Sequence, residues 1–203
     1  MKKSLMLIIM LTAGVFVAPF VSAQSNFSVL YSVGIPMGAL SDHTSEVSAR
    51  GMTMEYQKFI KSNISVGVNF GYSVFYEKLP YGSYTSGTAT LTGTQYRYNN
   101  LFPMLVNGQY HLNSDGAIKP YVGLGIGTIY NIRNTDMGLW TVEQNNWHFL
   151  VTPEAGITFG IGQNTALKLN AKYDNAFKTD KADSFANLNF NIGFVFHSGA
   201  GTF

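Results

Sequence analysis

Seven charged side chains are the main candidates for chemistry in this chain, because they recur on one side of segments whose other side is apolar. They are Glu55, Glu77, Arg97, Glu154, Lys168, Lys172 and Asp174. A charge removed from water needs a partner, since its desolvation is costly. If a turn occupies 162–164, Glu154 lies directly opposite Lys172. We therefore expect a Glu154–Lys172 ion pair, with Lys168 and Glu55 near it.

The other residue types that could do chemistry lack the required spacing. His43, His111, His148 and His197 form no HxxxH pattern, and the chain has no cysteine. The stretch GLGIG (123–127) lacks the following Lys-Ser/Thr of a phosphate loop. Its glycines are expected to face inward and to make room for large side chains opposite. The sequence thus predicts no metal, no cofactor and no enzyme activity.

Two local groupings of acidic residues, histidine and serine do not have the arrangement of a catalytic site. Asp136, Glu143 and His148 lie in or near one loop, but their spacing matches no protease motif, and His197-Ser198 are expected at the wrong end of the molecule for a deacylase. Catalysis requires acid and base groups within reach of each other, and no such pair is visible.

A period of two predicts the elements that position these residues. In ANLNFNIGFVF (186–196), Leu188, Phe190, Ile192, Phe194 and Phe196 alternate with residues that are mostly asparagine. Such alternation is typical of β-strands. Similar patterns predict eight strands, at about 26–36, 48–60, 64–77, 95–112, 118–130, 147–160, 165–177 and 184–197.

The connections alternate in length. Tight turns are expected at 61–63, 113–117 and 161–164, and mostly longer loops at 37–47, 78–94, 131–146 and 178–183. An even number of strands joined in this way favours an eight-stranded antiparallel up-and-down β-barrel. Pro103 and Pro153 lie inside predicted strands, so a bulge or local distortion is expected at each.

The ends and the composition indicate a secreted protein. Residues 1–23 combine two lysines, an apolar run and a Val-Ser-Ala site, and are predicted to be a signal peptide, with residues 24–203 forming one domain. Without Lys2 and Lys3, 11 of the 13 basic residues remain, and they balance the 11 acidic residues, so the formal net charge is near zero. This balance gives no indication of nucleic-acid binding.

The apolar set is predicted to face lipid. The opposite set is mostly Gly, Ser, Asn and Thr, a poor surface for a soluble barrel but a suitable filling for a narrow lumen. A soluble ligand-binding barrel is the alternative. Aromatic residues are expected to form a belt at the outer interface: Tyr72, Tyr76, Tyr96, Tyr98, Tyr130, Trp147, Tyr173 and Phe177.

The stretch IKPYVGLGIGTIY (118–130) resembles the Lys-Pro-Tyr, Gly-x-Gly-x-Gly strand of small bacterial outer-membrane barrels, and the flanking strands are similar to their neighbours there. The mature chain resembles the OmpA/OmpX-like porin-family group. This resemblance implies the outer membrane of a Gram-negative bacterium, contact with its lipids, and insertion by the barrel-assembly machinery. Such barrels usually end in an aromatic of the last strand, which here is either Phe203 or Phe196, followed by a tail.

The resemblance implies several roles: structural barrels, adhesion proteins, small pores, and OmpW-like carriers of hydrophobic molecules. The leading hypothesis is a non-enzymatic structural or surface-display barrel whose lumen is filled by the charged residues. The alternative is a narrow pore or an OmpW-like transporter with a polar lining. The loops 78–94 and 131–146 are expected to be the place where a surface partner would bind.

Overall fold

The computed structural model of the chain describes residues 24–86, 89–113, 116, 118–138 and 140–198. The predicted signal peptide (1–23) and Phe203 at the end of the tail lie outside these residues. In the described part of the chain, no helix is long and apolar enough to cross a membrane.

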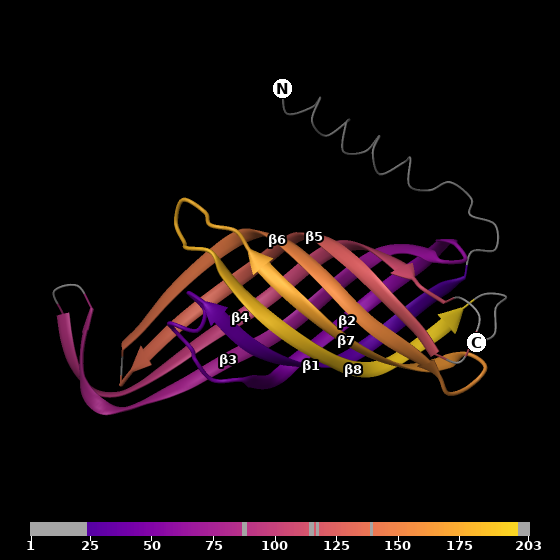
Figure 1. Cartoon of the computed structure of the whole chain (residues 1–203). Coiled ribbons are helices and arrows are strands. Elements are labelled where there is room, and N and C mark those ends of the chain that lie inside the picture. The colour runs from indigo at the N-terminus through magenta and orange to yellow at the C-terminus, as the bar shows by residue number, and fades with distance from the viewer. Residues whose placement is uncertain (1–23, 87–88, 114–115, 117, 139, 199–203) are drawn as a thin grey trace, which may run out of the picture.

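Eight antiparallel strands form a closed barrel, which confirms the predicted fold class (Figure 1). The strands are β1 (Ser25–Gly38), β2 (Ser48–Lys61), β3 (Ile64–Ser86), β4 (Ala89–His111), β5 (Ile118–Met137), β6 (Trp140–Gly160), β7 (Thr165–Ala176) and β8 (Phe185–Ser198). Each strand pairs with the next, and β1 closes the ring by pairing with β8 from Ser25↔Ser198 to Gly38↔Phe185. We call the end with Ser25 and Ser198 the terminal end and the opposite one the hairpin end.

The predicted loops 78–94 and 131–146 are wrong, because these residues mostly continue the strands. β3 pairs with β4 as far as Ser86↔Ala89, and β5 pairs with β6 as far as Met137↔Trp140. These stretches are rich in Thr, Tyr and other residues that favour strands, so the ladder continues beyond the barrel. The pairing of β3 and β4 shifts register between Leu79 and Gly82, and the hairpin curves away there (Figure 1).

The two faces of each strand have the predicted orientation. In β8, Asn187, Asn189 and Asn191 are buried in the lumen, whereas Phe190, Ile192, Phe194 and Phe196 are 48–50% exposed on the outside. Water would disfavour a continuous apolar outer surface, and lipid favours it. The barrel is therefore built to span a membrane, and the soluble alternative is wrong.

The two prolines inside strands interrupt the pairing without changing its register. On the β3 side of Pro103, pairing stops at Phe70↔Met104 and resumes at Ser73↔Leu101. On the β7 side of Pro153, it stops at Val151↔Asn175 and resumes at Glu154↔Lys172. Proline lacks the N–H that a ladder needs, but no residue is inserted. The distortion is local and is not a bulge.

An apolar layer, which the sequence did not predict, fills the lumen towards the hairpin end. Its members are Leu40, Phe75, Leu101, Leu105, Ile129, Leu150, Ala176 and Phe185. Phe75, which breaks the alternation of apolar and small polar residues in ISVGVNFGYSVFY (64–76), is completely buried. Leu40 lies in the loop between β1 and β2, so this loop folds into the barrel and covers the layer.

We predict that Gly193→Ala weakens the seam that closes the barrel. A Cβ at Gly193 would lie 2.0 Å from the carbonyl oxygen of Val29 on β1. We expect a loss of about 1–3 kcal/mol, typical of overpacking, in urea unfolding of the refolded protein. Gly108→Ala is the matched control, because its nearest neighbour would be 3.9 Å away. Equal stability of the two variants would contradict the assignment.

Candidate functional site

The lumen holds an ionic cluster of four residues: Glu55, Glu154, Lys168 and Lys172. Register pairs Glu154 on β6 with Lys172 on β7, and Lys172 Nζ lies 3.4 Å from Glu154 Oε2. This is the pair expected from the turn at 162–164. All four side chains are at most 6% exposed, so water contributes little to their solvation.

Glu55 holds the ionic cluster together. Its Oε2 lies 2.5 Å from Lys168 Nζ, and its Oε1 accepts a hydrogen bond from Lys172 Nζ. Glu55 belongs to β2 and both lysines belong to β7, strands that are not neighbours in the ring. The contacts therefore cross the lumen. Two carboxylates and two ammonium groups meet there, so the cluster carries no net formal charge.

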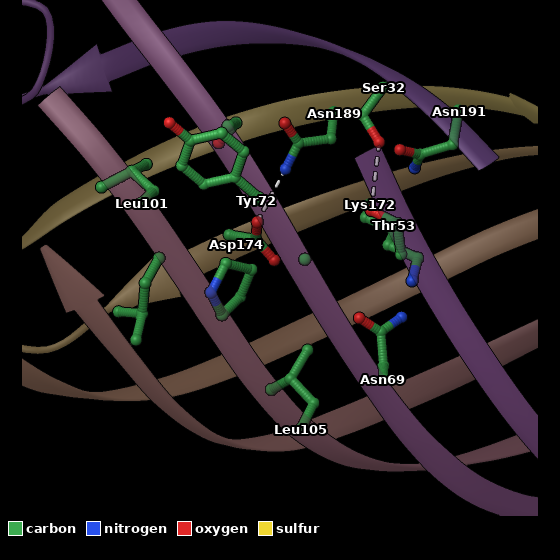
Figure 2. A pocket seen from close by; sticks show the side chains of 14 residues that line it. Ser32, Thr53, Asn69, Tyr72, Leu101, Leu105, Lys172, Asp174, Asn189 and Asn191 are labelled. Carbon is green, nitrogen blue, oxygen red and sulfur yellow. Dashed lines mark hydrogen bonds between the residues drawn. The ribbon is translucent and has the colours of Figure 1, made fainter. Parts of the chain in front are cut away.

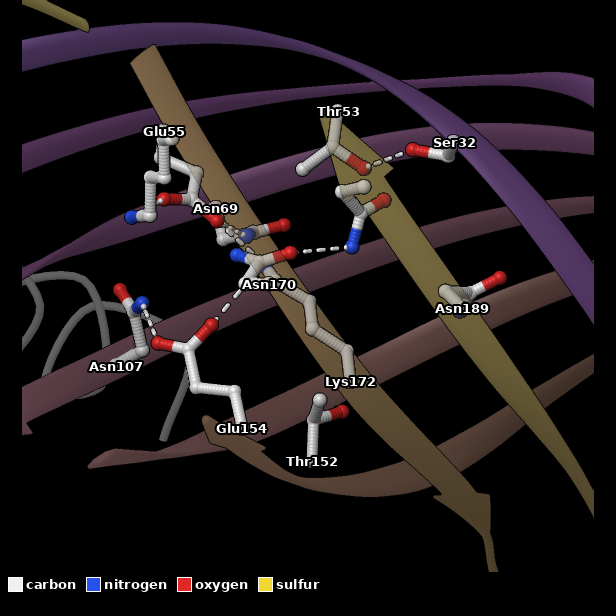
Figure 3. Close-up of polar contacts among 12 residues, drawn as sticks. Ser32, Thr53, Glu55, Asn69, Asn107, Thr152, Glu154, Asn170, Lys172 and Asn189 are labelled. Atoms are coloured by element: carbon white, nitrogen blue, oxygen red, sulfur yellow. Dashed lines mark hydrogen bonds and ion pairs between the residues drawn. The ribbon is translucent and has the colours of Figure 1, made fainter. Parts of the chain in front are cut away.

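Amide side chains donate further hydrogen bonds to the two carboxylates (Figure 3). Glu154 accepts hydrogen bonds from Asn107 (3.3 Å) and Gln109 (2.7 Å), and Glu55 accepts one from Asn69 (3.0 Å). A Cβ on Gly123 would lie 2.7 Å from Glu154 Oε1. The expectation that GLGIG makes room for a large side chain is confirmed at this glycine.

Asp174 lies next to the cluster but has neutral partners. It accepts hydrogen bonds from Thr152 (2.7 Å), Asn187 (3.2 Å) and Asn189 (2.7 Å). No cation of the described chain is within ion-pair distance of it. The asparagines of ANLNFNIGFVF thus solvate a buried carboxylate in place of water.

The remaining space beside the cluster is very small. A cavity of about 20 Å³ is lined by Lys172, Asp174, Asn189 and Asn191, among others (Figure 2). That volume suits about one water molecule. This cavity lies between the ionic cluster and the apolar layer, because its lining also includes Leu101, Leu105 and Ile129.

Glu77 and Arg97 do not join the cluster, although they face each other in register. Glu77 accepts hydrogen bonds from the backbone N (2.7 Å) and the hydroxyl (3.1 Å) of Ser45. Arg97 donates to Gln95 (3.1 Å) and to the carbonyl of His43 (3.4 Å). Both residues lie beyond the apolar layer, because β3 and β4 extend further than expected. There the loop between β1 and β2 supplies hydrogen-bond partners to both of them.

The predicted aromatic residues lie towards the hairpin end, and several are in ring contact. Tyr72 contacts Phe102, Phe102 contacts Tyr130, and Tyr130 contacts Trp147, which links four neighbouring strands. Further contacts join Tyr76 with Tyr96 and Tyr98, and Phe149 with Phe177. Tyr173 is 38% exposed. Phe102 and Phe149, which the sequence analysis did not include, complete these contacts.

Beyond the apolar layer, the hairpins enclose a cavity of about 520 Å³, which we call the hairpin cavity. It is lined by His43, Tyr84, Thr85, Gln95, Arg97, Arg133, Thr135, Met137, Trp140, Val142 and Gln144. His43 Nδ1 accepts a hydrogen bond from Asn99 (2.9 Å), and its Nε2 contacts Thr135 Oγ1 (3.1 Å). Burial, together with Arg133 and Arg97, lowers the pKa of His43 to about 4.

Among residues 24–198, as far as they are described, no group of three or more His, Cys, Asp or Glu side chains could hold a metal ion. The carboxylates of the ionic cluster are enclosed, and each has a lysine within ion-pair distance. What the arrangement can do is fill and rigidify a barrel and present a basic cavity at one end.

We predict that Glu55→Gln is severely destabilising, because it leaves two buried lysines with one carboxylate. The expected loss is about 3–5 kcal/mol of unfolding free energy, measured by urea titration of the refolded protein. The matched control is Asp183→Asn, which removes one carboxylate from the exposed Lys178–Asp183 pair; we expect no measurable change there. A mild Glu55→Gln phenotype would show that the cluster is not stabilising.

We predict a pH-dependent contribution of His43. Its pKa of about 4 lies below its ordinary value of 6.5, so the folded state favours the neutral ring. The stabilisation is complete above pH 6.5 and declines as the pH falls towards 4. The stability difference between the native protein and His43→Asn should shrink over this window in urea titrations. A constant difference would refute this.

No protein-family model and no curated protein matches the chain. Solved structures do match. Ail of Yersinia pestis, in complex with the heparin analogue sucrose octasulfate, has a TM-score of 0.54 at 11% identity over 88% of this chain and 100% of that one.

Two further structures are similar. Neisserial surface protein A has a TM-score of 0.52 at 11% identity, over 86% of this chain and 96% of its own. Outer membrane protein OprG of Pseudomonas aeruginosa has a TM-score of 0.52 at 11% identity, over 88% and 97%. The chain has the fold of these small outer-membrane barrels, and with its apolar outer surface it is an eight-stranded β-barrel of the bacterial outer membrane.

Proposed function

We propose that the protein is a non-enzymatic outer-membrane barrel with a closed lumen, which holds two structured hairpins at the cell surface. The observation that carries this proposal is the closure of the lumen in two layers. The ionic cluster crosses the lumen through Glu55, the apolar layer lies above it, and a cavity of about 20 Å³ lies between the two.

The hairpins support a display role. Both extend the barrel wall as paired strands, so they present a defined shape rather than irregular chain. Ail has the same fold and has been solved in complex with the heparin analogue sucrose octasulfate, so a barrel of this fold can bind a sulfated saccharide. For this chain, a surface partner at 78–94 and 131–146 is part of the proposal.

The competing hypothesis is transport, either through a narrow pore or by an OmpW-like route for hydrophobic molecules. A pore requires a continuous aqueous path, whereas eight strands enclose little more than their own side chains. A lateral route for hydrophobic molecules does not need an open lumen, so it requires a separate test by uptake of a hydrophobic tracer into vesicles.

We predict that the refolded barrel is electrically silent in a planar bilayer. Folding is verified first by the heat-dependent shift on an SDS gel, and a sixteen-stranded porin, which encloses an aqueous channel, serves as the positive control. Reproducible discrete openings of the native protein would overturn the closed-lumen proposal.

The two-layer closure makes a further prediction for the same measurement. Phe75→Ala with Leu105→Ala thins the apolar layer but leaves the ionic cluster in place, so this variant should also remain silent. Adding Lys172→Ala to these two changes weakens both layers, and small discrete openings should then be observed. Openings in the first variant would show that the ionic cluster does not close the lumen.

A further inference from the structure

The hairpin cavity contains two arginines that have no acidic partner. Among the described residues, no carboxylate lies within 4.0 Å of the guanidinium of Arg97 or of Arg133. Arg133 donates only to uncharged oxygens, those of Asn99 (3.3 Å) and Ala39 (3.4 Å). Glu77, which register places opposite Arg97, is engaged by Ser45. Two half-buried cations of this kind favour an anionic ligand.

A smaller cavity of about 180 Å³ adjoins this site, and we call it the side cavity. Arg133 and Gln144 line both cavities. The side cavity is also lined by Asn131 and His148, which are 4% and 2% exposed. Asn131 Oδ1 and His148 Nε2 are buried without a hydrogen-bond partner. Such atoms carry a desolvation cost unless a ligand or water satisfies them.

The geometry shows what these two atoms require. His148 Nδ1 lies 3.0 Å from the carbonyl oxygen of Phe177 and donates to it, so Nε2 of the neutral ring is an acceptor. Asn131 Oδ1 is an acceptor as well. Both therefore need hydrogen-bond donors, such as hydroxyl groups. The acidic residue of the side cavity, Asp183, is paired with Lys178 at 2.9 Å.

The wall of the hairpin cavity adds an aromatic surface. Trp140 lines it and is 68% exposed, with Tyr84, Met137 and Val142 nearby. A volume of about 520 Å³ lies in the range of about 300–1,000 Å³ that is typical of ligand sites.

We propose that the hairpin end binds an acidic saccharide. Its anionic substituent pairs with Arg97 and Arg133, its hydroxyl groups donate to Asn131 and His148, and an apolar ring face lies against Trp140. This proposal rests on the proposed exposure of the hairpin end at the cell surface. The same chemistry is found in soluble sulfated glycans and in the phosphorylated sugars of lipopolysaccharide.

The test is isothermal titration of the refolded barrel in detergent with a sulfated tetrasaccharide and with the same tetrasaccharide lacking sulfates. We expect saturable binding of the first and a loss of about tenfold or more without sulfates. Arg133→Gln and Arg97→Gln should each weaken binding about tenfold or more. His148→Phe keeps a ring beside Phe185 (5.0 Å) but removes Nε2, so it should weaken the binding of both tetrasaccharides.

Arg50→Gln is the matched control, because Arg50 is exposed and lies 5.6 Å from the ring of Tyr76, outside both cavities. It should bind like the native protein. The proposal is overturned by absence of saturable binding, by an equal loss in Arg50→Gln, or by complete displacement with inorganic sulfate at the same sulfate concentration. Each variant is first checked for folding by the heat-dependent gel shift.

A second arm separates the two sources of the ligand. Binding is repeated in vesicles with and without lipopolysaccharide. Competition by lipopolysaccharide identifies its phosphorylated sugars as the ligand, whereas undiminished binding of the tetrasaccharide identifies a soluble glycan. Because neither arm measures conductance, failure of the saccharide site and failure of the closed-lumen proposal remain distinguishable.

Discussion

The interior of this barrel depends on one carboxylate that crosses the lumen. Glu55 on β2 reaches Lys168 and Lys172 on β7, and none of these three groups has access to bulk water. Enclosing any of them alone would be very costly, whereas together with Glu154 they neutralise one another. This requirement explains why the lumen wall near them is made of amides and glycine. The amides supply the remaining hydrogen bonds, and Gly123 leaves the space that Glu154 occupies.

Alternation and turn spacing were sufficient to predict the local geometry. The period of two gave the strands and the inward face of Asn187, Asn189 and Asn191, and the turn at 162–164 gave the register of Glu154 with Lys172. Both depend only on neighbours along one hairpin. The contact between Glu55 and β7 depends on how the whole ring closes, which no single strand encodes. For the same reason the sequence did not reveal the apolar layer, whose members come from six strands and from the loop between β1 and β2.

The hairpin end was the least predictable part. Its Thr-, Ser- and Gly-rich sequence is typical of loops, but the same threonines and tyrosines also favour strands, and continued pairing with the barrel decides between the two. Arg133 was missed because it lies beyond the expected end of its strand, at about 130. Its importance follows from its position between two cavities, with no described carboxylate within 4.0 Å of its guanidinium, and a linear sequence does not show such a position.

The strands differ in length, so the two sides of the barrel differ in height at the hairpin end. β3 to β6 rise well above the level at which β1 and β8 end, at Gly38 and Phe185, and they stand as a partial cylinder over the rim (Figure 1). On the tall side the rim consists of paired strands, and on the low side it consists of the segments that contain Leu40 and Lys181. The wall of the hairpin cavity is therefore built from β3 to β6, to which the loop between β1 and β2 adds His43. None of its lining residues comes from β1, β2, β7 or β8.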